Sequence, residues 1–287
     1  MFKHIPWFGQ FLHEILLQLT EKTRLLLMEK ITLLGTGGAV VDGKRDNVSL
    51  VFTSGDFHLL IECGGSAAHK LAKLGILYET VADIIITHTH LDHLYGLPGF
   101  IFSLGYRDVQ RTTPLRIYCP EKAQAVIRAL LDLFTLRAEF AFPIEIHAIP
   151  YLEGAFVLEN DQVVVTSTPV DHVPRIPTHG IKISSRASGK SVVYSSDTGP
   201  SEHLIRLAKQ ADILFHECCG LAGHPIPVIH SNALQVGDIA RKSAVKKLVL
   251  IHLDTILNDD PEALIAQVRQ NFQGEVVVAS DFDEYIL

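Results

Sequence analysis

The chain has 287 residues, 47% of them hydrophobic, and a formal net charge of -7. This composition is typical of a globular protein, and the dispersed basic residues do not predict a nucleic-acid surface. No stretch reaches the roughly 18 uninterrupted apolar residues of a transmembrane segment. The four cysteines form neither a CxxC pair nor a disulfide framework, which favours a reducing cytoplasm.

The first 28 residues are expected to form a separate amphipathic extension. Apolar side chains recur there at helical spacing, at Phe8, Phe11, Leu12, Ile15, Leu16 and Leu19. Such a stripe fits packing on the chain's own flank, a dimer contact or a membrane-surface helix. Met28 offers an alternative start just before the first expected strand. We predict a helical extension over 1–28 and one α/β domain over 29–287.

From Ile31 the chain alternates between short apolar strands and helices. In the first half, strands are expected over 31–34, 48–52, 57–61, 82–86, 115–118 and 144–149, and helices over 66–74, 94–104 and 121–136. The helix over 94–104 is expected to break at Pro98-Gly99, and the glycine-rich turn 35–38 to let the backbone pass near a site.

The second half begins with strand-rich spacing and then alternates again. Strands are expected around Phe156 and over 163–167, 181–183, 192–195, 212–215, 247–251 and 275–279, and helices over 201–209, 232–242 and 261–271. The order predicts the α/β class, as an αββα sandwich of two mixed β-sheets flanked by helices.

The densest chemical cluster follows the strand expected at 82–86. His88 and His90 are two positions apart on extended chain, so their side chains point the same way and can bind one ion. Asp92 and His93 follow after the chain turns towards a helix, which suits them to a second ion. Imidazole nitrogen and carboxylate oxygen are ligands of borderline-soft divalent metals.

Three later residues stand where other expected strands end, namely His172, Asp197 and His252. Singly, each fits a structural role as well as a functional one. Together they occupy the carboxyl ends of strands, where loops gather into a site. The predicted ligand sets are His88, His90 and His172 for one ion and Asp92, His93 and His252 for the other, with Asp197 bridging them.

The HxHxDH motif at 88–93 resembles the signature of the metallo-β-lactamase superfamily, and the order of the later ligands resembles its ribonuclease Z branch from about Met28 onwards. His216-Glu217-Cys218-Cys219 stands where that branch has a His-Glu-Ala-Thr box, and His230-Ser231-Asn232-Ala233 where it has a His-Ser/Thr-Thr-Ala box. The resemblance implies the metallo-β-lactamase fold. It also implies that Asp92 orients the attacking hydroxide, and that Glu217 orients His230 as an acid near the leaving group.

The chain also departs from the ribonuclease Z pattern. The residues between His172 and Asp197 are too few for the tRNA-gripping arm of that branch, and the Ser-x-Arg after its last ligand is replaced by Leu253-Asp254-Thr255. Glu62 stands before the Cys-Gly turn where an Asp is usual. The segments around Val173-Pro174 and from Ser195 to Pro200, together with the His252-Leu253 ending, look closer to arylsulfatase-like relatives, which points away from tRNA.

The sequence therefore predicts a hydrolase with two Zn²⁺ ions, Mn²⁺ or Fe²⁺ being alternatives, that attacks a phosphodiester with a metal-bridging hydroxide. The alternatives are an arylsulfatase-like or other small-ester hydrolase, a tRNA 3'-processing endonuclease, and a metal-binding module without catalysis. The expected partners are a small anionic ester, with RNA as an alternative substrate, and a second copy of the chain in a homodimer.

Overall fold

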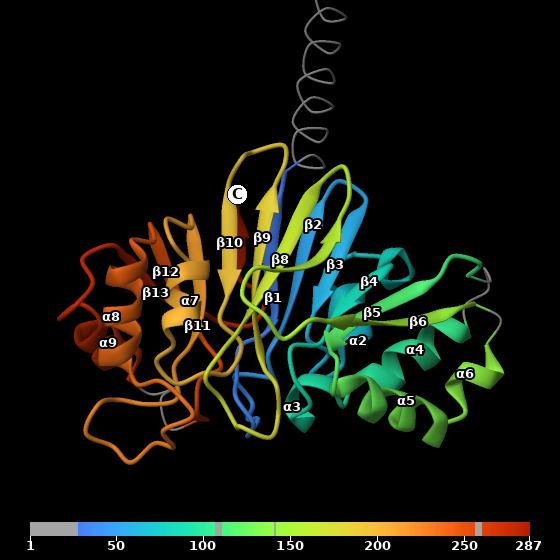
Figure 1. Ribbon diagram of the computed structural model, residues 1–287, viewed down its shortest axis with the longest axis horizontal. Coiled ribbons are helices and arrows are strands. Elements are labelled where there is room, and N and C mark those ends of the chain that lie inside the picture. Colours follow the sequence, from blue (N-terminus) through green and yellow to red (C-terminus); the bar gives the residue numbers. More distant parts are fainter. Residues whose placement is uncertain (1–27, 107–110, 141, 256–259) are drawn as a thin grey trace, which may run out of the picture.

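The computed structural model describes residues 28–106, 111–140, 142–255 and 260–287. Two seven-stranded sheets pack face to face, and helices cover the outer face of each (Figure 1). This αββα sandwich of two mixed sheets confirms the predicted fold class. The amphipathic helix predicted within residues 1–28 lies outside the described residues except for Met28.

The first sheet has the strand order β14-β1-β2-β3-β4-β5-β6. Its strands are β1 (Lys30–Gly35), β2 (Ser49–Ser54), β3 (Phe57–Ile61), β4 (Asp83–Ile85), β5 (Leu115–Pro120), β6 (Ile144–Ile149) and β14 (Glu284–Ile286). The strands from β3 to β6 run parallel, and those from β14 to β3 pair antiparallel. Its helices are α2 (Ala67–Lys73), α3 (Leu91–Leu94), α4 (Leu97–Gly105), α5 (Ala123–Leu133) and α6 (Leu136–Glu139), with a 3-10 turn at Tyr78–Thr80.

The second sheet has the order β13-β12-β11-β10-β9-β8-β7. Its strands are β7 (Ala155–Glu159), β8 (Val163–Pro169), β9 (His179–Ser185), β10 (Ser191–Tyr194), β11 (Ile213–Glu217), β12 (Lys247–Ile251) and β13 (Glu275–Val278). Strands β10 to β13 run parallel, and β7 to β10 pair antiparallel. Its helices are α7 (Glu202–Leu207), α8 (Ala233–Ser243) and α9 (Pro261–Val268).

Three apolar layers hold the sandwich together. The central one lies between the sheets, where Phe52 of the first sheet and Phe215 of the second are almost fully buried. Each outer face has its own layer, exemplified by Phe100 of α4 below the first sheet and Val236 of α8 below the second. Complete burial of one such side chain stabilises the fold by about 1.5–3 kcal/mol, so the layers make a rigid scaffold for the loops.

Most predicted elements are present within a few residues of their predicted bounds, but three details were wrong. The break predicted at Pro98-Gly99 falls at Tyr95-Gly96, because Pro98 occupies the first turn of α4, where its missing N–H is not needed. The helix predicted over 121–136 divides into α5 and α6 at Thr135, whose φ of 55° is left-handed. Strand β14 was not predicted, since its pairing with β1 is a long-range contact.

The loops that matter for function leave the carboxyl ends of the strands. Strands β3, β4, β8, β10, β11 and β12 each end beside a candidate site residue: Glu62, His88, His172, Asp197, Glu217 and His252. Helix α3 and the loop that follows β8 lie at the same lower edge of the sandwich in Figure 1. The parallel strands of both sheets therefore deliver their polar ends to one edge, as expected for this class of fold.

Candidate metal centre

The HxHxDH segment forms the first wall of the centre. It leaves β4 in extended conformation and enters the single-turn helix α3 at His90, which caps that helix. Because the chain turns at His90, the side chains of His88 and His90 point in a different direction from those of Asp92 and His93. His88 Nε2 and His90 Nδ1 lie 3.1 Å apart, while Asp92 and His93 pair with each other at 3.4 Å on the other side.

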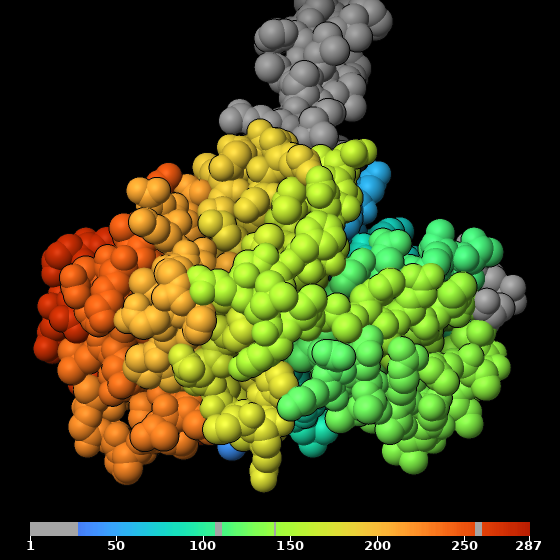
Figure 2. All heavy atoms as spheres, in the orientation of Figure 1, coloured from blue at the N-terminus to red at the C-terminus, as the bar shows by residue number. Residues whose placement is uncertain are grey.

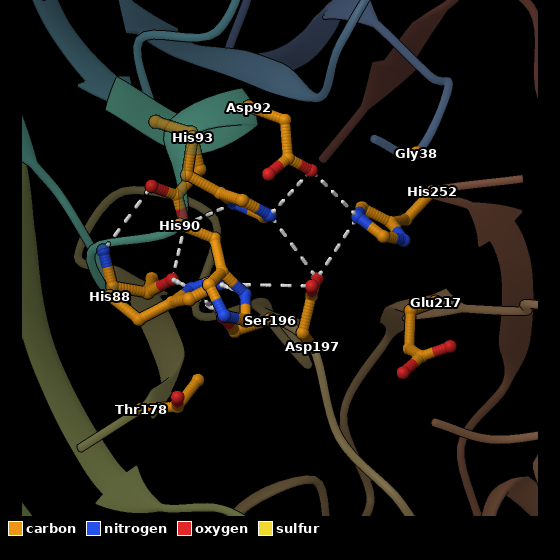
Figure 3. A network of polar contacts seen from close by, with 12 residues as sticks. Gly38, His88, His90, Asp92, His93, Thr178, Ser196, Asp197, Glu217 and His252 are labelled. Carbon is orange, nitrogen blue, oxygen red and sulfur yellow. Dashed lines mark hydrogen bonds and ion pairs between the residues drawn. The ribbon is translucent and has the colours of Figure 1, made fainter. Parts of the chain in front are cut away.

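Three loops of the second sheet complete the centre. His172 Nε2 lies 3.1 Å from His90 Nδ1, and Asp197 Oδ2 lies 3.7 Å from His88 Nε2. On the other side, His252 Nε2 lies 3.4 Å from Asp92 Oδ2 and 3.3 Å from Asp197 Oδ1 (Figure 3). The structure thus brings all seven predicted ligands together in two groups that share Asp197. We name them site 1 (His88, His90, His172, Asp197) and site 2 (Asp92, His93, His252), which Asp197 Oδ1 joins through contacts of 3.4 Å with His93 and 3.3 Å with His252.

The spacing of the donor atoms fits tetrahedral metal ligation. A ligand distance of about 2.0–2.1 Å places neighbouring donors of a tetrahedron about 3.3 Å apart. In site 2 the contacts His93–Asp92, His93–Asp197 and His252–Asp92 all measure 3.4 Å. In site 1 the corresponding contacts run from 3.1 Å for His88–His90 to 3.9 Å for His172–Asp197.

Unsatisfied buried atoms point to the same ions. His93 Nε2 and Asp197 Oδ1 are buried without a hydrogen-bond partner among the described residues. Buried polar atoms are nearly always paired, so two of them aimed at one point require a further ligand. Divalent cations satisfy both, and the donor set of five imidazoles and two carboxylates is one that such ions bind.

The two sites differ in how they hold protons. Burial lowers the pKa of His172 to about 4, and burial together with the charge of His93 lowers the pKa of His88. Burial is the largest influence on His93 and His252 and acts to lower their pKa values, but Asp197, Asp92 and the other nearby carboxylates together outweigh it and raise both pKa values above 6.5. Site 1 therefore presents neutral imidazoles, whereas a cation entering site 2 displaces protons.

A buried carboxylate supports ligands of both sites from behind. Glu62 accepts hydrogen bonds from the backbone N–H and the hydroxyl of Thr87, and its Oε1 lies 3.4 Å from His93 Nδ1. The Thr87 hydroxyl in turn contacts His88 Nδ1 at 3.2 Å and Ser196 Oγ at 2.5 Å. We name Glu62, Thr87 and Ser196 the support cluster. The cluster fixes the orientation of His88 in site 1 and of His93 in site 2. Glu62 has a longer side chain than the usual Asp and still contacts His93.

The backbone is strained at three points around the two donor groups. Glu62, Ser196 and His252 have φ values of 61°, 55° and 52°, in the left-handed region that side chains rarely adopt. Such conformations persist where the surrounding structure enforces them, and they gather at functional sites. At His252 the turn is covered by Gly38, where a Cβ would lie 3.3 Å from the imidazole Cε1. The predicted passage of the glycine-rich turn near the site is confirmed.

His230 and Glu217 form a second polar unit beside site 2. Glu217 is completely buried, and its Oε1 accepts hydrogen bonds from His230 Nδ1 at 2.8 Å and from the Thr198 N–H at 2.9 Å. His230 is placed just before α8 by the capping box of Asn232 and Gln235. With Nδ1 engaged, Nε2 is the nitrogen left for the site. Burial alone would lower the pKa of His230, but Glu217 raises it above 6.5.

The sequence did not identify the support cluster or the backbone contacts that hold the ligands. Thr87 precedes His88 and Ser196 precedes Asp197, so both adjoin predicted ligands, but their hydroxyls meet only after the two sheets pack. The Ile229 carbonyl, which accepts a hydrogen bond from His172 Nδ1 at 3.1 Å, carries no side-chain pattern at all. Adjacency to a ligand was the one available indication.

Comparison with known proteins gives consistent matches over most of the chain. The family model described as anti-Pycsar protein Apyc1 matches residues 29–272. A ribonuclease Z of Methanothermobacter thermautotrophicus is 30% identical, over 85% of this chain and 92% of its own length.

Two solved structures share the fold. The metallo-β-lactamase fold protein YhfI from Bacillus subtilis has a TM-score of 0.74 at 22% identity, covering 91% of this chain and 100% of its own. The short form of human tRNase Z has a TM-score of 0.72 at 23% identity, covering 89% and 98%. No helix in the described parts of the chain is long and apolar enough to cross a membrane.

Proposed function

The chain belongs to the anti-Pycsar protein Apyc1 family, a ribonuclease Z-like group of metallo-β-lactamase-fold hydrolases. From this premise we propose that the chain is a dinuclear zinc phosphodiesterase that acts on small substrates. As a member of this group it is a metal-dependent hydrolase of ester bonds. The dinuclear site, zinc and the phosphodiester substrate are the proposed part.

One observation carries the proposal: two adjacent donor groups share Asp197 and lie beside a histidine held by a buried carboxylate. Two divalent ions bound there would supply Lewis acidity and activate water for attack on a phosphoryl group. We assign His88, His90 and His172 to one zinc, and Asp92, His93 and His252 to the other. Asp197 offers Oδ2 to site 1 and Oδ1 to site 2, which suits a bridging ligand.

Two side chains, those of Asp92 and His230, have the remaining catalytic roles in this proposal. Asp92 is partly exposed while its Oδ2 faces His93 and His252, so its other oxygen can orient the attacking water. His230 keeps its proton because Glu217 raises its pKa, and it presents Nε2 towards the ligands of site 2. It can therefore donate that proton to the departing ester oxygen, as a general acid does.

The shape of the chain favours a small substrate. All residues from 170 to 199 are described, and they form the loop after β8, strands β9 and β10 and the turn between these strands. No arm extends from this part of the structure. A tRNA would need contacts beyond the centre, whereas a compact phosphodiester needs only the ions and the loops around them.

The test is metal content and hydrolysis on the purified full-length protein. We expect about two equivalents of zinc and turnover of bis(p-nitrophenyl) phosphate, lost on chelation and restored by Zn²⁺. If only Mn²⁺ or Fe²⁺ restored turnover, that ion would replace zinc in the proposal. Turnover of p-nitrophenyl sulfate instead would favour the arylsulfatase-like alternative. Full metal content without turnover of either ester would favour the non-catalytic module.

Processing of tRNA is the second candidate function, because the relative that is 30% identical over 85% of the chain is named ribonuclease Z. A precursor tRNA with a 3' extension tests it directly. Release of the extension at rates comparable to bis(p-nitrophenyl) phosphate turnover would replace the small-substrate proposal. Absence of cleavage by a metal-loaded enzyme would remove this candidate.

The family description also suggests a biological setting. We propose that the chain counteracts Pycsar, as the description of the family states for its members. Expression of the wild type should relieve Pycsar activity in a cell, and Asp197→Ala should not. Equal relief by both would separate this role from hydrolysis.

Three further predictions concern the state of the protein. We propose a homodimer, supported by an apolar groove of about 470 Å³ between α3, α4, α5 and α6 and by the exposed Phe102 and Phe134 beside it. Light scattering on the purified chain tests it.

The four free cysteines fit our prediction of a reducing cytoplasm. Residues 1–28 remain a predicted extension to the hydrolase domain 29–287.

A further inference from the structure

The loop between β8 and β9 carries an exposed cation close in the chain to a predicted ligand. It leaves β8 through His172, a predicted ligand of site 1, and Arg175 follows three positions later. Arg175 is exposed and has no ion-pair or hydrogen-bond partner in the described parts of the chain. An unpaired guanidinium close to a site for anionic esters is available to bind the substrate.

The loop is held in a defined shape. The Ile176 N–H donates to the Val173 carbonyl at 2.8 Å, which closes a tight turn with Pro174 and Arg175 at its centre. The Thr178 hydroxyl donates to the Ile176 carbonyl at 3.0 Å. Proline fixes its own φ, so the turn keeps Arg175 at its tip with little loss of entropy on binding.

A second loop, residues 220–230, lies against the start of the same loop, at Asp171 and His172. Gly199 lies between them: its N–H donates to the Asp171 carbonyl at 2.7 Å, and a Cβ added to it would lie 2.6 Å from the Val228 carbonyl. Both loops reach the lower edge of the molecular surface in Figure 2, in yellow and orange. They therefore form one continuous wall on the His172 side of the centre.

Val228 gives that wall an apolar group. Its side chain is 91% exposed, although its neighbours are engaged in the centre: the Ile229 carbonyl accepts from His172 and His230 contacts Glu217. An exposed valine held between two such anchors presents apolar surface next to the predicted proton donor. It suits contact with an apolar ester group of the substrate.

We propose that these two loops form a substrate-recognition wall, in which Arg175 binds an anionic oxygen of the phosphodiester and Val228 contacts one of its planar apolar ester groups. This inference rests on the proposed function. The favoured substrates are anionic phosphodiesters with at least one apolar aryl ester.

Steady-state kinetics of the zinc-loaded full-length protein test the cation. Arg175→Gln should raise KM for bis(p-nitrophenyl) phosphate about tenfold with kcat and metal content nearly unchanged, and Arg175→Lys should recover part of the loss. KM of the wild type should rise with salt more steeply than KM of Arg175→Gln. Arg186→Gln is the matched control, because Arg186 is exposed at the opposite end of β9 and pairs with Glu159.

The apolar contact has its own test. The wild type should prefer bis(p-nitrophenyl) phosphate over methyl p-nitrophenyl phosphate, and Val228→Ser should reduce that preference about fivefold. Val126→Ser, at a half-exposed position on α5, should not change it.

The outcomes separate this inference from the proposed function. An active wild type whose KM responds no more to Arg175→Gln than to Arg186→Gln would overturn the role of Arg175. An unchanged aryl preference in Val228→Ser would overturn the role of Val228. A zinc-loaded wild type that hydrolyses no phosphodiester would overturn the proposed function, and the wall with it.

Discussion

The two halves of the molecule supply the metal centre in different ways. The first half places four donors within one short segment, His88 to His93, where a strand passes into a single helical turn. The second half supplies His172, Asp197 and His252 from three separate loops that follow β8, β10 and β12. The first set is local in sequence, and the second is assembled by the sheet.

Neither half holds an ion alone. Site 1 combines His88 and His90 with His172, and site 2 combines Asp92 and His93 with His252, while Asp197 joins both. Each proposed ion would therefore link loops of the two sheets at one edge of the sandwich. The comparison teaches that a dense local motif is only half of a binding site, and that the loops of the other sheet decide whether it binds.

The strongest way to break this comparison is to remove the shared ligand. Asp197→Ala should abolish binding of both ions and reduce phosphodiester turnover about a thousandfold or more, because it removes the carboxylate that faces His88 of site 1 and His252 of site 2. Elemental analysis and the turnover rate measure the two effects. If the variant kept two equivalents of metal, Asp197 would not be the bridge between the halves.

Removing one distant ligand from each site sharpens the comparison. His172→Ala and His252→Ala should each lose about one equivalent of metal, and the ions that remain should respond differently to acid. The ion left in His172→Ala occupies site 2, where the pKa of His93 is raised, so protons should displace it at a higher pH. The ion left in His252→Ala faces the lowered pKa of His88 and should stay bound to a lower pH.

Metal content measured after dialysis across a pH series gives this result. Loss of both ions from either variant would mean that the two sites do not bind independently. Identical acid release from the two variants would contradict the assigned difference in proton occupancy.

The unit of Glu217 and His230 belongs entirely to the second half and can be tested without touching a predicted ligand. Glu217→Gln should lower turnover about tenfold to a hundredfold at neutral pH with metal content unchanged. His230 acts in its protonated form and its pKa is raised, so wild-type turnover should fall as pH rises through a value above 6.5. In Glu217→Gln, which lacks the carboxylate, the fall in turnover should occur at a lower pH. A profile that stayed in place would exclude His230 as the acid.

The smallest expected effect concerns the support cluster that links the halves behind the ligands. Thr87→Val removes the hydroxyl shared by Glu62, His88 and Ser196, and should weaken zinc binding at site 1 about tenfold. Competition with a chelator measures the affinity. Thr166→Val on β8 is the control and should leave it unchanged. Equal affinities in the two variants would show that the hydroxyl does not orient His88.

The sequence by itself determined the elements and the kinds of donor. The alternation of short apolar runs and amphipathic stretches predicted the αββα class, because buried strands and one-sided helices have distinct periods. The first half of the centre could also be read directly, since His88, His90, Asp92 and His93 are neighbours in the chain. The ends of three later expected strands added His172, Asp197 and His252, and the resemblance to a known family added His230 with Glu217.

Only the tertiary structure decided how these residues meet. The distances between the donors, the approach of opposite oxygens of Asp197 to the two sites, and the support of His93 by Glu62 and of His88 by Thr87 and Ser196 appear only in the folded chain. The proposed wall of Arg175 and Val228 likewise joins segments far apart in the chain. Strand β14 was missed for the same reason. Periodicity describes which face of an element is buried, but distances between loops arise only when the two sheets pack, and those distances set the chemistry of the centre.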